Sequence, residues 1–168
     1  MAHTQTGNGT TRSATRWKKA PALSEKEGDS PREQGVSFEA GEAKVQDVLD
    51  RFARALTSGD GEAAADVWET PAFVVGGGMA RAVSGRDEVV VFFAAGKDQY
   101  NSRGIADTRA EIQRLDWVSE DLVVVDVRWP YLTEDGVEVG EENSSYTLMA
   151  DSDGALKIRT VLMRGGSE

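Results

Sequence analysis

The sequence predicts an α+β domain in which helices come first and long strands follow. Between residues 45 and 95 apolar side chains recur mostly at helical spacing, whereas beyond residue 108 they alternate with the period of two that is typical of strands. Turn-like segments at 119–121, 134–136 and 152–154 separate the later apolar runs, which favours an antiparallel meander. We therefore expect the helices to cover one face of a curved sheet.

The chain divides into a polar tail and one folded domain. Its 168 residues are enough for one core and too few for two full-sized domains. Residues 1–38 hold six basic and four acidic side chains and are predicted to form a disordered basic tail, with a weak binding arm at 12–19 as the alternative. Residues 39–168, the predicted domain, hold thirteen basic and twenty-five acidic side chains. Such an acidic domain repels phosphate backbones, so we expect no nucleic-acid partner.

The composition also excludes several kinds of chemistry. There is no cysteine, which excludes a disulfide, a thiolate nucleophile and a cysteine metal site. His3 is the only histidine and lies in the predicted tail, so we expect neither histidine-dependent catalysis nor a metal site. No segment approaches the roughly 18 apolar residues of a membrane span, and the N-terminus lacks the apolar core of a signal peptide. We expect a cytoplasmic protein without a cofactor or a membrane partner.

The first two helices are predicted from an apolar stripe and a break. The stripe has the spacing i, i+3, i+4, i+7 and i+11 and is formed by Val45, Val48, Leu49, Phe52 and Leu56. The glycine-containing segment 58–61 ends this helix. Asp60 is placed to cap a short second helix that ends near Trp68.

A short strand and a third helix are predicted next. The apolar residues 73–75 form the strand, and the glycine run 76–78 forms a flexible turn after it. Ser84 with Asp87 fits a capping box at the start of the third helix, which we expect to fray before Asn101.

Longer strands complete the predicted domain, at 108–118, 122–132, 141–151 and 156–164. On the second of them one face is apolar and forms the natural core or lining, with Val123, Val125, Val127, Trp129 and Tyr131. The opposite face of the same strand holds Asp126 and Arg128.

Local patterns along the first half of the domain resemble a known superfamily. The run ALTSGDGEAAADVW at 55–68 is followed by AFVV at 72–75, VSGRDE at 83–88 and FF at 92–93. This series is similar to the nuclear transport factor 2-like superfamily, particularly its SnoaL-like bacterial members, over about residues 40–164. The resemblance implies a cystatin-like, cone-shaped barrel, in which three N-terminal helices pack into a strongly curved, mostly antiparallel sheet. It also implies a pocket inside the cone and dimerisation through the sheet, but no single activity.

The ketosteroid isomerases of this superfamily would need three groups that the chain mostly lacks. The resemblance puts their base just after the first strand, where this chain has Gly76, and their oxyanion tyrosine where it has Phe52. Their second acid falls near Tyr146, which is left to donate a hydrogen bond. We therefore do not expect isomerase activity of that type.

The epoxide hydrolases of the superfamily offer another catalytic hypothesis. They use a carboxylate, an arginine and a second carboxylate, and Asp126 and Arg128 share one strand face at the required spacing, in reversed order. No acid stands near Val161, where the second carboxylate would fall. The alternative is an ion pair on the outer face of the sheet, which contributes little.

Aromatic and apolar side chains lead to the preferred hypothesis, a homodimer that binds a small apolar or aromatic molecule in the cone pocket. Seven residues are predicted to contact this ligand: Trp68, Phe73, Met79, Phe93, Trp129, Tyr131 and Met163. One alternative is a small enzyme of the isomerase, cyclase or epoxide hydrolase type that uses Asp126, Arg128 and Tyr146. The other is a non-catalytic assembly or adaptor domain.

Overall fold

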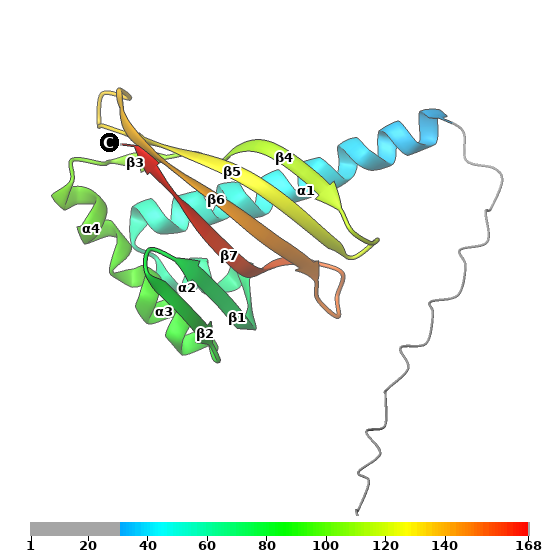
Figure 1. The fold of residues 1–168 in the computed structure, drawn as a ribbon, viewed down its shortest axis with the longest axis horizontal. Coiled ribbons are helices and arrows are strands. Elements are labelled where there is room, and N and C mark those ends of the chain that lie inside the picture. The colour runs from blue at the N-terminus through cyan, green and yellow to red at the C-terminus, as the bar shows by residue number, and fades with distance from the viewer. Residues whose placement is uncertain (1–30, 168) are drawn as a thin grey trace, which may run out of the picture.

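The computed structural model describes residues 31–167, so the predicted tail lies outside the described residues except for its last eight positions. The helices are α1 (Pro31–Ser58), α2 (Gly61–Val67), α3 (Arg86–Ala94) and α4 (Gly96–Ser102). They gather on one side of the sheet, with the long α1 running obliquely behind it (Figure 1). Within the described part of the chain, no helix combines the length and apolar character needed to cross a membrane.

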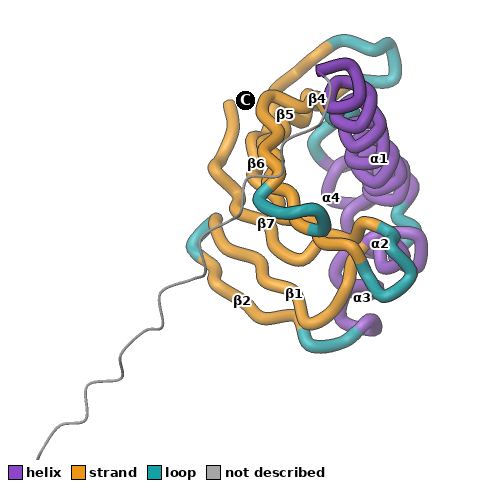
Figure 2. Tube along the Cα trace, turned by 90° about the vertical axis from the view of Figure 1, so that its right-hand side faces the viewer, coloured by secondary structure: helices purple, strands orange, loops and turns teal. Residues whose placement is uncertain are grey.

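The strands form one mixed, open sheet across the described residues. They are β1 (Trp68–Gly76), β2 (Met79–Val83), β3 (Asp107–Thr108), β4 (Glu111–Trp117), β5 (Leu122–Leu132), β6 (Glu138–Ala150) and β7 (Leu156–Ser167). Their order is β2-β1-β7-β6-β5-β3, and β4 also pairs with β5. The pairing is antiparallel except between β1 and β7, so the predicted meander of long strands is confirmed. The curved sheet forms one layer and the helices the other (Figure 2).

The predicted α+β class is confirmed, but the sheet does not close into a barrel. Among the described strands, β2 pairs with β1 and lies at one edge, and β3 and β4 lie at the other. An open sheet leaves one face toward the helices and the other uncovered by them (Figure 2). We call these the inner face and the outer face.

The first helix begins earlier than the sequence pattern suggests. It starts at Pro31, eight residues before the predicted domain boundary, and proline favours the first position of a helix because its ring presets φ and the missing N–H has no helical partner there. The predicted break after it is confirmed. Helix α1 ends at Ser58, and the Asp60 carboxylate accepts a hydrogen bond of 3.0 Å from the backbone N–H of Ala63.

The prediction for the start of the third helix is wrong in detail. Gly85 occupies the N-cap position without a side-chain hydrogen bond, so Ser84 and Asp87 do not form a capping box. Instead the backbone N–H of Ser84 donates to Glu88 Oε1 over 3.2 Å. The chain then continues into α4, where we expected fraying.

The core lies between α1, α2 and the inner face. The α1 stripe is buried at Val45, Val48, Leu49 and Phe52, and the apolar face of β5 is buried along its length. Helices α2 and α3 approach so closely that a Cβ atom at Gly61 would lie 2.2 Å from the Val90 carbonyl oxygen. This contact holds α3 over one end of the sheet, where it borders the site described next.

Candidate functional site

A hollow of about 450 Å³ lies between the helices and the inner face of the sheet. Helices α1, α3 and α4 border it on one side, and strands β1, β5, β6 and β7 on the other. Val91 and Phe92 on α3 belong to its lining and are 73% and 41% exposed, so the rim is apolar as well. We call this hollow the cone pocket. Its size is that of a site for a small organic molecule.

Packed aromatic rings support one side of the cone pocket. The Phe52 ring meets the rings of Trp68, Phe93, Trp129 and Tyr146 edge to face, with centroids 5.9, 5.1, 6.0 and 6.4 Å away. Such edge contacts stabilise the cluster beyond its buried area because the ring edges and faces carry opposite partial charges. Phe52 thus provides shape at the position where the resemblance would place the hydroxyl group of the isomerases.

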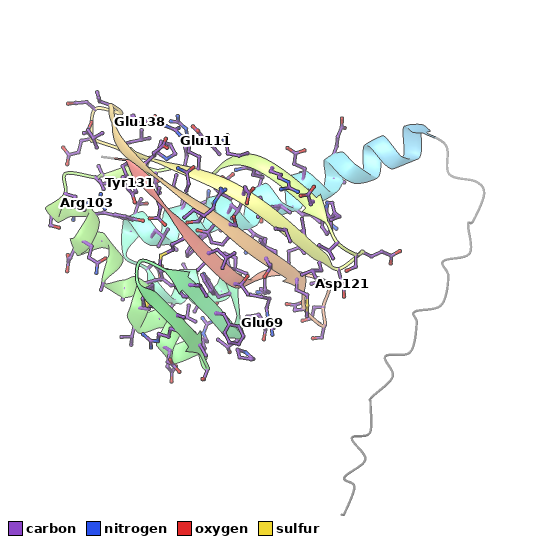
Figure 3. All side chains as sticks on the ribbon, viewed as in Figure 1. Glu69, Arg103, Glu111, Asp121, Tyr131 and Glu138 are labelled. Atoms are coloured by element: carbon purple, nitrogen blue, oxygen red, sulfur yellow. The ribbon has the colours of Figure 1, made fainter. Side chains whose placement is uncertain are left out.

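A carboxylate stands at the polar end of the cone pocket. On β6 the period of two points Glu142, Ser144 and Tyr146 to the inner face. The Tyr131 hydroxyl donates to Glu142 Oε2 over 2.9 Å, and the Ser144 hydroxyl donates to Glu142 Oε1 over 3.0 Å. Arg103, which follows α4, lies with its Cζ atom 4.9 Å from the centroid of the Tyr131 ring. Figure 3 shows Tyr131 and Arg103 together at this end of the sheet.

A second hollow of about 550 Å³ meets the cone pocket at this carboxylate. Both hollows are lined by Arg103, Tyr131, Glu142 and Met163, and the second opens between the β1–β2 turn and the end of β7. Glu142 is therefore within reach of a ligand from either hollow.

All three tyrosines of the chain line the cone pocket, although they lie far apart in the sequence. Burial and the negative charge of Glu142 raise the pKa of Tyr131 to about 12. Burial raises the pKa values of Tyr100 and Tyr146 as well, and the Glu142 charge adds to both shifts. The phenols therefore remain protonated at neutral pH and act as hydrogen-bond donors beside a carboxylate.

These tyrosines allow a pH test of the pocket. A raised pKa means that the protonated phenol is favoured in the folded state. Its contribution to stability is therefore complete below the ordinary pKa of about 10 and is lost as the pH rises through the folded-state value, about 12 for Tyr131. We expect the phenolate absorbance of the native protein to appear well above pH 10, and that of the urea-unfolded chain near pH 10. Coincident native and unfolded titrations would contradict the described burial.

The structure does not bring together the three residues suggested for catalysis. Tyr146 lines the cone pocket, but Asp126 and Arg128 lie on the outer face of the sheet. Asp126 accepts a hydrogen bond of 2.5 Å from the Ser145 hydroxyl and lies 3.8 Å from Arg164. Arg128 instead pairs with carboxylates from β4 and β6, those of Glu111, Glu138 and Glu141. The shared strand face was predicted correctly, but this face points away from the pocket.

Four of the seven residues predicted to contact a ligand line the cone pocket, namely Trp68, Phe93, Tyr131 and Met163. Trp129 lies in the buried core beneath it, and Met79 packs against that core. Phe73 is 50% exposed on the outer face, because β1 alternates and turns Ala72 and Val74 inward instead.

Sequence reasoning missed much of the lining, including Tyr100, Arg103 and Glu142. Glu142 had a usable signal, since it stands four positions before Tyr146 and therefore on the same strand face. Tyr100 and Arg103 had none, because they depend on α4 folding back over the pocket where the sequence suggested fraying.

Comparisons with known proteins give a family and a fold. A protein-family model described as NTF2-like protein (DUF6841) matches residues 41–166. No sequence among the curated proteins matches the chain. A Nostoc punctiforme domain of unknown function with a cystatin-like fold is similar in structure, with a TM-score of 0.60 and 18% identity over 74% of this chain and 76% of that one.

Two further solved structures are similar to the chain. An NTF2-like protein of unknown function from Shewanella oneidensis has a TM-score of 0.56 and 17% identity, over 73% of this chain and 98% of its own. A ketosteroid isomerase-like protein from Erwinia carotovora has a TM-score of 0.55 and 16% identity, over 72% and 92%. At these identities the similarity shows a shared fold.

Proposed function

We propose that this chain, which belongs to the NTF2-like (DUF6841) family, binds a small, flat, apolar molecule in the cone pocket. The observation that supports this proposal most directly is the hollow of about 450 Å³ bordered by aromatic rings and by exposed apolar side chains on α3. A pocket of this size and character suits a molecule of about two fused rings. Burial of its apolar surface is the source of the affinity.

We propose further that the protein is a homodimer formed through the outer face of the sheet. Phe73, Val75 and Leu162 are 50%, 41% and 48% exposed there, and Val75 is paired with Leu162 across the β1–β7 ladder. Adjacent exposed apolar side chains of this size are typical of an interaction surface. This arrangement leaves the cone pocket, on the inner face, accessible in each copy.

Methionine methyl groups provide a site-specific test of ligand binding. Met163 lines the cone pocket, whereas Met149 is 37% exposed on the outer face and serves as the internal control. In protein labelled with ¹³C at the methionine methyl groups, we expect 2-naphthylmethanol to shift the Met163 resonance, because the ring current acts on nearby methyl groups, and to leave Met149 unchanged. The variants Met163→Leu and Met149→Leu assign the two signals.

Two outcomes would contradict the proposal. One is the absence of any shift of the Met163 signal up to the solubility limit of the probe. The other is a shift of Met149 alone, which would place the binding site on the outer face.

A further inference from the structure

The cone pocket combines an apolar lining with one carboxylate. This combination restricts the charge of the ligand as well as its shape. We propose that the pocket selects a molecule whose apolar ring system carries a protonated amine, with the ammonium group bound by Glu142. This inference rests on the proposed ligand-binding function and names the chemical class of the ligand.

The hydrogen bonding of Glu142 supports this assignment. An ionised carboxylate accepts about four hydrogen bonds. Glu142 receives one on each oxygen, from Tyr131 and from Ser144, which orient the carboxylate and leave lone pairs for a ligand. An ammonium group has three N–H donors and no acceptor, so it can donate hydrogen bonds to the remaining lone pairs of the carboxylate.

The rings around Glu142 also favour a cation. Tyr100, Tyr131 and Tyr146 line the same pocket, and an ammonium group is attracted to the negative face of an aromatic ring. The structure already contains one such contact, between the Arg103 guanidinium and the Tyr131 ring. Beside the burial that is the main cause, the charge of Glu142 raises the pKa of each of the three phenols, whereas Arg103 lowers the pKa of Tyr100 and Tyr131.

Arg103 makes an anionic ligand the main competing possibility, because it lines both hollows. An anion bound by Arg103 would have to lie close to Glu142, since the two residues share both linings, and like charges repel there. A cation at Glu142 is repelled by Arg103 in the same way, but it also matches the remaining lone pairs of Glu142 and is attracted to the tyrosine rings, and an anion gains neither. The observations therefore favour the ammonium ligand over a carboxylate ligand.

Three probes with the same ring system test the charge preference. They are 2-naphthylmethylamine, 2-naphthylmethanol and 2-naphthoate, compared by isothermal titration calorimetry at neutral pH and low salt. We expect the amine to bind about tenfold or more tighter than the alcohol, because the ammonium group adds an attraction between opposite charges to the hydrogen bond that either probe can donate to Glu142. The naphthoate is expected to bind more weakly than the alcohol.

The variant Glu142→Gln tests whether the charge of this residue causes the preference for the amine. It should remove the tenfold advantage of the amine and leave alcohol binding within about threefold of the wild-type value, because the amide still accepts hydrogen bonds. Glu138→Gln is the control. It removes an equal charge from the same strand, from a carboxylate that pairs with Arg128 and lines neither hollow, and should preserve the preference for the amine.

The outcomes separate this inference from the proposed function. If the alcohol binds but the amine binds no tighter than the alcohol, the inference is overturned and the proposed function stands. The inference is also overturned if Glu142→Gln retains the full preference for the amine. If none of the three probes binds to the wild-type protein, both the proposed function and this inference fail.

Discussion

Replacing Gly76 by aspartate is expected to lower the free energy of unfolding by about 2–6 kcal/mol. Gly76 has φ of +130°, a conformation that side chains strain, and a Cβ atom there would lie 2.4 Å from the Met163 carbonyl oxygen. The strain accounts for about 1–3 kcal/mol, and the forced shift of β1 against β7 for a similar amount. Urea unfolding followed by circular dichroism measures the change.

Gly78→Asp is the control for this experiment, because it introduces the same charge in the same turn. Gly78 has φ of +78° and no atom within 4 Å of an added Cβ, so only the conformational cost of about 1–2 kcal/mol remains. Equal losses in the two variants would show that the approach of β7 is not what requires glycine at position 76.

The Gly76 geometry also bears on the chemistry of the site. This is the position at which the resemblance to ketosteroid isomerases would place a catalytic base. In this chain the parallel pairing of β1 with β7 presses the backbone of Met163 against it. The space for a side chain is therefore closed, and a substitution at this position cannot restore a carboxylate without moving the sheet.

Replacing Leu162 by glutamate is expected to convert the proposed dimer into a monomer. The side chain lies beside Val75 on the outer face, and burying an unpaired carboxylate from each copy in one interface costs several kcal/mol. Light scattering after size exclusion should give 36.2 kDa, twice the chain mass of 18.1 kDa, for the wild-type protein and 18.1 kDa for the variant.

Val91→Glu is the control for the dimer test. Val91 is 73% exposed, but it lies on α3, on the other side of the sheet, so a charge there should leave the dimer intact. A wild-type mass of 18.1 kDa, or loss of the dimer in both variants, would contradict an interface on the outer face.

Sequence patterns alone predicted most of the fold because they depend on neighbours a few residues apart. The α1 stripe, the Asp60 cap and the alternation along β5 each follow from helix or strand periodicity and from local hydrogen bonding. Errors occurred where tertiary contacts outweigh these rules. Helix α4, for example, has no buried residue by which its pattern could be recognised, yet it supplies Tyr100 to the pocket.

The sequence by itself determined the α+β class, the absence of cysteine chemistry and which side chains share a strand face. Only the tertiary structure decided which of those faces meets the helices. It put Asp126 and Arg128 outside and Glu142 inside, because β5 and β6 turn their apolar rows toward α1, and a polar residue in such a row is carried inward with it. The convergence of three distant tyrosines on one pocket is likewise a product of strand order and of α4 closing over the sheet.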